Sequence, residues 1–176
     1  KALAELDSVQ RERVIVIGTA EVLERAAGVT GVDIAFATTP TPGAILLEQV
    51  EQPGPAPQWG RIDPAAGDAA FRYVERAVRL AQERGGCIVT APINKEALNL
   101  AGHHYDGHTG MIAALTGAKS SFMLLAAETL ATIHVSTHVS LEDAIRRATR
   151  QRVLDTITAG HDFLRRLGIK RPRIAV

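Results

Sequence analysis

Short β-branched runs alternate with helix-period segments along this chain, and that alternation restricts the fold more than any other feature of the sequence. Residues 14–17 and 32–36 are two such runs, and a helical segment at 21–27, capped by Thr19 and closed by Gly28, lies between them. Repetition of strand, helix and strand predicts a layered α/β domain. The length of 176 residues suits one such domain with a full core.

The later segments continue the pattern. Helices are expected from Asp63-Pro64 to Gly85, over residues 95–101, over 108–116, after a Ser140 cap completed by Asp143, and over 152–167. Strands are expected at 87–91, 121–125 and 130–135, the last two as a hairpin. Residues 38–60 are rich in proline and glycine, and the apolar run at 44–47 is interpreted as a strand or ribbon within an insertion.

Both ends of the sequence favour a piece of a longer protein. The chain begins with a helical composition at residues 1–6 and no initiator methionine, and it stops at 173–176 in an apolar run typical of a strand. We therefore expect residues 1–176 to be a single α/β region of a longer protein.

Charge and cysteine content exclude several classes of protein. The 20 Lys and Arg residues nearly balance the 19 Asp and Glu residues, and the basic residues form no long run, so no nucleic-acid partner is expected. No segment approaches the roughly 18 apolar residues of a membrane span, which predicts a soluble, cytoplasmic protein. The single cysteine, Cys87, excludes a disulfide framework, and its apolar neighbours predict an inert thiol in the core.

The sequence also predicts an anion site. Lys95 stands where a helix begins after the apolar run at 87–91, and ligands of open α/β sheets collect beyond the carboxyl ends of strands. His108 and Thr109 begin the next helix, where unpaired amides and partial positive charge suit phosphate or carboxylate. A cation at a helix start is unfavourable, and an anion would offset that cost for Lys95. The alternative is that Asp106 caps the helix and His108 is a surface residue.

Two further histidines lie near the end of the predicted strand at 130–135. His134 and His138 are four residues apart, and alternation turns both to one face only if the strand stays regular. Neutral imidazole is a common ligand of divalent metals, although a lone histidine at a strand end is more often a packing or surface residue. Because a catalytic ion needs about three protein ligands, these two residues offer part of a metal site at most.

Nucleotide-binding fingerprints are missing from the sequence. No Gly-x-Gly-x-x-Gly follows a strand, and no Walker A pattern occurs. Spacing alone therefore supports an anion-binding α/β domain and no more specific activity.

Four short motifs resemble those of the 4-hydroxythreonine-4-phosphate dehydrogenases of pyridoxal phosphate biosynthesis. They are residues 91–95 (Ala-Pro-Ile-Asn-Lys), 106–109 (Asp-Gly-His-Thr), 123–126 (Met-Leu-Leu-Ala) and 136–141 (Ser-Thr-His-Val-Ser-Leu). The resemblance covers essentially the whole chain. It implies the α/β fold of isocitrate and isopropylmalate dehydrogenases, here incomplete, with NAD bound without a glycine fingerprint and a site between two domains at a homodimer interface.

The resemblance also implies roles for particular residues. It places a substrate-binding pair on His108 and Thr109 and one of three divalent-metal histidines on His138, with zinc, magnesium or cobalt as the metal. Lys95 joins the substrate-binding candidates because of its position. The other two metal histidines and most NAD contacts are expected beyond Val176. Catalytic and NAD-binding residues within the chain stay unassigned.

One position departs from the family pattern. The vitamin B6 members typically have Glu after the His-Thr pair, and this chain has Gly110. Glycine there resembles the branch that oxidises D-threonate or D-erythronate 4-phosphate. Loss of a carboxylate removes repulsion and opens space for a substrate that carries both a carboxylate and a phosphate.

The resulting hypothesis is an NAD-dependent, metal-dependent oxidation, with decarboxylation, of a phosphorylated hydroxy acid such as 4-phosphohydroxy-L-threonine. D-Threonate or D-erythronate 4-phosphate is the alternative substrate. A non-catalytic phospho-ligand-binding or dimerisation module is the alternative of another class, and a phosphoacyl transferase is a third. The isolated chain is expected to be inactive and to bind metal weakly.

Overall fold

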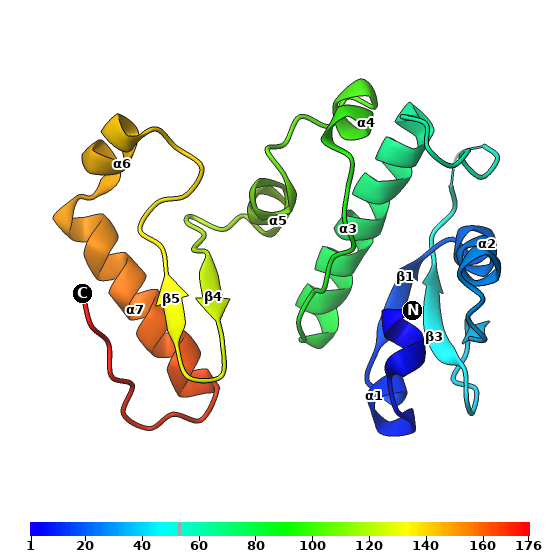
Figure 1. Cartoon of the computed structure of the whole chain (residues 1–176), viewed down its shortest axis with the longest axis horizontal. Helices are drawn as coiled ribbons and strands as arrows, with labels where there is room; N and C mark the ends of the chain where they lie inside the picture. The colour runs from blue at the N-terminus through cyan, green and yellow to red at the C-terminus, as the bar shows by residue number, and fades with distance from the viewer. Residues whose placement is uncertain (53) are drawn as a thin grey trace. The chain divides into compact units, whose positions relative to one another are not determined.

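The computed structural model describes residues 1–52 and 54–176, which form two compact units, Lys1–Ala118 and Lys119–Val176 (Figure 1). The first unit contains a three-stranded parallel sheet, and the second contains a two-stranded antiparallel hairpin. Helices accompany both sheets, which confirms the predicted α/β class.

The elements of the first unit follow one another in this order: the 3-10 helix η1 (Ala2–Glu5), α1 (Ser8–Glu12), β1 (Ile15–Gly18), α2 (Ala20–Thr30), β2 (Phe36–Ala37), β3 (Ile45–Gln49), α3 (Pro64–Arg84), α4 (Lys95–Leu100) and α5 (His108–Thr116). The second unit contains β4 (Leu124–Ala126), β5 (Ala131–Ile133), α6 (Leu141–Arg147) and α7 (Arg150–Arg166). Among the helices of the described residues, none combines the length and the apolar character that a membrane span requires.

The parallel sheet has β3 at its centre, in the order β1-β3-β2. Ile45 and Leu47 of β3 are 0% and 3% exposed, so this strand is part of the core. The interpretation of residues 38–60 as an insertion is therefore wrong. The strand interpreted at residues 44–47 is confirmed as β3 (Ile45–Gln49). Its central place in the sheet was missed, because the composition of a window does not show where its apolar residues pack.

Helix α3 packs against α4 and α5, the two helices whose first residues form the candidate site. It begins after Asp63, whose side chain accepts a hydrogen bond from the Ala65 amide at 2.8 Å, and it ends at Gly85, as predicted. Val74 and Val78 of α3 pack with Met111 of α5 in one buried cluster. In Figure 1, α3 lies beside β1, with α4 and α5 packed along it.

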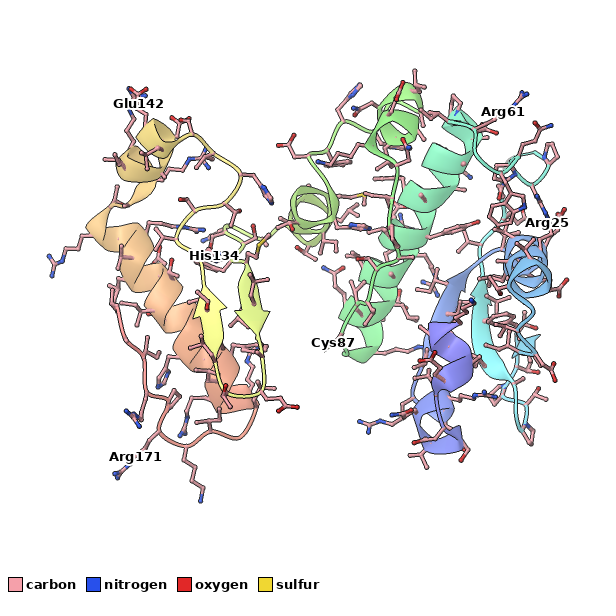
Figure 2. All side chains as sticks on the ribbon, in the orientation of Figure 1. Arg25, Arg61, Cys87, His134, Glu142 and Arg171 are labelled. Atoms are coloured by element: carbon pink, nitrogen blue, oxygen red, sulfur yellow. The ribbon has the colours of Figure 1, made fainter. Side chains whose placement is uncertain are left out.

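The predicted strand at residues 87–91 does not form among the described residues. This segment has no regular secondary structure and no strand partner, Val89 is 94% exposed, and Cys87 is exposed beyond the end of α3 (Figure 2). The prediction of a core thiol is therefore wrong. Only Ile88 packs against the core cluster from this segment. Apolar composition predicts burial, but a strand also needs a neighbour for its backbone groups.

Helix α2 is longer than predicted. It continues through Gly28 and ends at Gly31, whose φ of 63° is the left-handed conformation that glycine adopts without strain. The expected cap by Thr19 does not form, since its hydroxyl oxygen accepts from no amide at the helix start among the described residues. The hydroxyl donates to the Val50 carbonyl oxygen at 2.8 Å and lies 2.6 Å from the Tyr73 hydroxyl.

Other predicted elements are shorter or missing. The strand expected at 32–36 is reduced to β2 (Phe36–Ala37), and the one expected at 173–176 does not form. The helical start expected at 1–6 is the 3-10 helix η1, and the sequence interpretation missed α1 (Ser8–Glu12) after it.

The second unit packs α7 against the predicted hairpin. β4 and β5 pair antiparallel, with Leu124 opposite Ile133. Gly160 of α7 faces this pair, since a Cβ at that position would lie 3.4 Å from Ile133. Ser140 caps α6 as predicted: its hydroxyl oxygen accepts from the Asp143 amide at 3.1 Å.

Candidate functional site

The start of α5 is open to a ligand. Gly107 is its N-cap residue, with φ 141°, and no side chain in the described part of the chain caps the first-turn amides. Asp106 therefore does not cap the helix, which was the alternative interpretation. His108 and Thr109 are the first two helical residues, as the sequence predicted. Uncapped amides at the start of a nine-residue helix suit an anionic group.

Lys95 lies beside this helix start. Its Cε is 3.8 Å from the place that a Cβ on Gly107 would occupy. Lys95 is the first residue of α4, whose N-cap Asn94 accepts a hydrogen bond from the Ala97 amide at 2.9 Å. The structure thus brings Lys95 close to the turn that delivers His108, which the sequence did not show. A cation next to two helix starts is unfavourable unless an anion accompanies it.

His108 supplies a second indication of a ligand. Its Nε2 atom is buried and has no hydrogen-bond partner among the described residues. Buried polar atoms nearly always have a partner, and an exception calls for a missing ion, water or ligand. Thr109 is exposed, so its hydroxyl is available at the same helix start.

The loop between α4 and α5 is tied to α3 by His103. Its Nε2 is 2.9 Å from Oδ1 of Asp68, and its ring stacks on Phe71 with 3.8 Å between the ring centroids. For His103 the structure shows an anchoring role, which sets where the following residues begin α5.

This anchor should make the first unit sensitive to acid. The hydrogen bond from His103 and the nearby Arg72 guanidinium hold the pKa of Asp68 below its ordinary value of 3.8, although desolvation opposes the shift. A lowered pKa in the folded state stabilises the fold fully above pH 3.8, and this contribution is lost as pH falls through the folded-state pKa. Urea unfolding from pH 2 to 7 should therefore show Asp68→Asn less stable than the parent chain near neutral pH, with the difference shrinking in acid. A constant difference would contradict the linkage.

His138 lies in the second unit and has an unusual backbone. It is exposed, and its φ of 56° makes it the one non-glycine residue with positive φ in the described chain. Such a conformation costs about 1–3 kcal/mol, persists where the surroundings impose it, and is common at ligand sites. An exposed imidazole on a constrained loop fits the chemistry of one divalent-metal ligand.

His134 directly follows β5 (Figure 2). Its amide donates to the Met123 carbonyl oxygen at 3.0 Å, while its buried Nδ1 has no partner within the described ranges. No group of three or more His, Cys, Asp or Glu side chains in the described chain is placed to hold a metal ion.

Comparison with known proteins gives consistent matches. A family model described as "Pyridoxal phosphate biosynthetic protein PdxA" matches residues 10–176. The chain is 40% identical to the D-threonate 4-phosphate dehydrogenase of Salmonella typhimurium, over 100% of this chain and 57% of that protein. It is 38% identical to the 4-hydroxythreonine-4-phosphate dehydrogenase of Geobacter metallireducens, over 99% of this chain and 54% of that protein.

A solved structure extends the match to the fold. The crystal structure of a 4-hydroxythreonine-4-phosphate dehydrogenase from Burkholderia phymatum superposes with a TM-score of 0.86 and 39% identity, covering 98% of this chain and 55% of that chain. The dehydrogenase fold class expected from the resemblance is thereby confirmed. The chain spans about half the length of the relatives it matches.

Proposed function

Because the chain belongs to the family of the pyridoxal phosphate biosynthetic protein PdxA, we propose that it binds the substrate in an NAD-dependent oxidation of a small phosphorylated hydroxy acid. The observation that carries the proposal is the uncapped start of α5, with Lys95 beside it and the unpartnered Nε2 of His108. Together these groups offer a cation, backbone amides and two polar side chains to one anion.

The phosphate is the group that fits this place best. The first-turn amides point along the helix axis and can donate hydrogen bonds to a phosphate oxygen, which accepts from several donors. The Thr109 hydroxyl and the Lys95 ammonium add donors of their own, and the ammonium offsets charge. His108 would hold a further substrate oxygen through Nε2. These residues would bind and orient the substrate, and NAD, when bound, would supply the hydride acceptor for the oxidation.

We further propose His138 as one of three ligands to a divalent cation, zinc, magnesium or cobalt. When bound, such an ion acts as a Lewis acid on the substrate hydroxyl and on the carbonyl that replaces it. His138 would contribute an imidazole nitrogen from a loop whose backbone is constrained at this residue. The remaining metal ligands and most NAD contacts are proposed to come from sequence beyond Val176, in a longer two-domain protein that acts as a homodimer.

Substitutions at the start of α5 test the substrate site. In the full-length enzyme, His108→Ala and Thr109→Ala should each raise KM for the phosphorylated substrate about tenfold or more, because a charge-assisted hydrogen bond is lost. KM for NAD should change little. Thr116→Ala, at the other end of the same helix, is the control and should change neither constant. Equal losses towards substrate and NAD would show that the pair is structural.

Gly110 favours D-threonate 4-phosphate as the substrate, with 4-phosphohydroxy-L-threonine as the second candidate. A Cβ at Gly110 would meet nothing within 4 Å, so this part of the site has room for a substrate carboxylate. Relatives with both substrate names match the chain.

A substrate panel separates the two candidates. Gly110→Glu should fit without destabilising the fold, yet it should lower kcat/KM for D-threonate 4-phosphate about tenfold or more relative to 4-phosphohydroxy-L-threonine, through repulsion between carboxylates. Gly28→Glu, in the open part of α2, controls for added charge. An unchanged ratio between the two substrates would remove Gly110 from the explanation of specificity.

A further inference from the structure

The loop that carries His138 is fastened at both ends within the second unit. At its start the His134 amide donates to the Met123 carbonyl oxygen at 3.0 Å. At its end Ser140 caps α6. These two attachments limit where the loop can go, but neither fixes the peptide units just before His138.

Arg152 of α7 supplies the missing attachment. Its Nε donates to the Val135 carbonyl oxygen at 2.9 Å, and its Nη2 donates to the Ser121 carbonyl oxygen at 3.0 Å. The guanidinium also lies over the ring of Phe122, 4.2 Å from the centroid. One side chain thus links α7 to the segment before β4 and to the loop after β5.

Within the described chain, the Arg152 guanidinium binds backbone carbonyl oxygens and not a carboxylate. None of the ion pairs formed by the described residues includes this guanidinium. A planar fork with several fixed donors can bind two carbonyl oxygens at once, which a single ammonium cannot reproduce. Because Val135 is only three residues before His138, this fork restrains the backbone that leads into the left-handed residue.

We propose that Arg152 is a positioning residue for the metal ligand His138, an inference that rests on the proposed role of His138. A backbone with φ 56° at a histidine persists only where its surroundings impose it. Loss of the bond to Val135 lets the loop relax towards the common negative φ, which turns the imidazole away from its present direction. The loop must then become ordered when the metal binds, and this ordering lowers the affinity for the metal.

Zinc affinity measured by calorimetry on the full-length protein tests this proposal. Arg152→Met should raise the zinc Kd about 10–100-fold, the usual effect of removing a group that orients a ligand. Arg152→Lys keeps the charge and one donor group, so it should fold at least as well as the methionine variant and lose less affinity. Phe122→Leu removes the ring under the guanidinium but leaves both hydrogen bonds, and it should change the zinc Kd no more than about twofold, by the same reasoning.

The outcomes separate this inference from the proposed function. If His138→Ala leaves zinc binding unchanged, the ligand assignment fails and the role of Arg152 fails with it. If His138→Ala weakens zinc but both Arg152 variants bind it like the parent, only the positioning role is overturned. Equal weakening by Arg152→Met and Phe122→Leu, with equal losses of thermal stability, would also overturn it, because general loosening would then explain the effect.

Discussion

Gly67→Ala should lower the free energy of unfolding by about 3 kcal/mol or more, the upper range for overpacking a core. Gly67 lies where α3 crosses α4, and a Cβ there would be 2.1 Å from the Ala97 carbonyl oxygen and 2.8 Å from the Leu98 amide nitrogen. Both contacts are with backbone, and Leu98 is fully buried, so no flexible side chain can move aside. The helices must separate, which shifts the start of α4 and Lys95 with it.

A matched substitution isolates the crossing from the general effect of replacing glycine in a helix. Gly28 lies inside α2 with nothing within 4 Å of a Cβ, so Gly28→Ala should raise stability by about 0.5–1 kcal/mol. Urea unfolding of the two variants and the parent chain measures both changes in the free energy of unfolding, the expected loss and the expected gain. A Gly67→Ala variant as stable as the parent would show that α3 and α4 are not in contact there.

Local signals in the sequence predicted the helices better than the strands. The bounds of α5 were predicted correctly, because Gly117 and the polar turn before His108 mark its ends within the segment itself. The cap at Asp63 and the stop at Gly85 identified α3 in the same way. Capping depends on residues three or four apart, so one sequence contains the whole signal.

Strands depend on partners that are distant in the sequence. Residues 87–91 have a strand-like composition, yet no described strand pairs with them. β3 has weak flanking signals, yet it lies between β1 and β2 because both pair with it. Parallel pairing is non-local, so neither result follows from a window of the sequence.

In the candidate site too, local features were predictable and contacts between distant residues were not. Its residue types and helix position were predictable, since His108 and Thr109 follow directly from the start of α5. The approach of Lys95 to Gly107 and the two hydrogen bonds of Arg152 join residues from separate elements. No signal in the sequence marked them. The positive φ of His138 was not predictable either, because a histidine in a sequence does not indicate that conformation as a glycine does.

The variants of His138 should separate function from folding by the signs of their effects. In the full-length enzyme, His138→Ala should lower kcat about 1,000-fold or more, since removing a metal ligand forfeits several kcal/mol of charge stabilisation in the transition state. His138→Gly should lose activity to the same degree. It should also raise the free energy of unfolding by about 1 kcal/mol, because glycine adopts φ 56° without the strain of a Cβ.

The control for these variants is His161→Ala, since His161 is an exposed histidine of α7 whose imidazole pairs, among the described residues, with Asp162 alone. It should leave both turnover and stability close to those of the parent enzyme. If His138 were only structural, its truncation would lower the stability of the enzyme, and the enzyme that remains folded would keep its turnover. If His138 is a metal ligand in a strained backbone, His138→Gly should lose turnover and gain stability, because the strain is tolerated for the position it gives the imidazole. Full turnover with an unchanged metal content in His138→Gly would therefore remove His138 from the metal site.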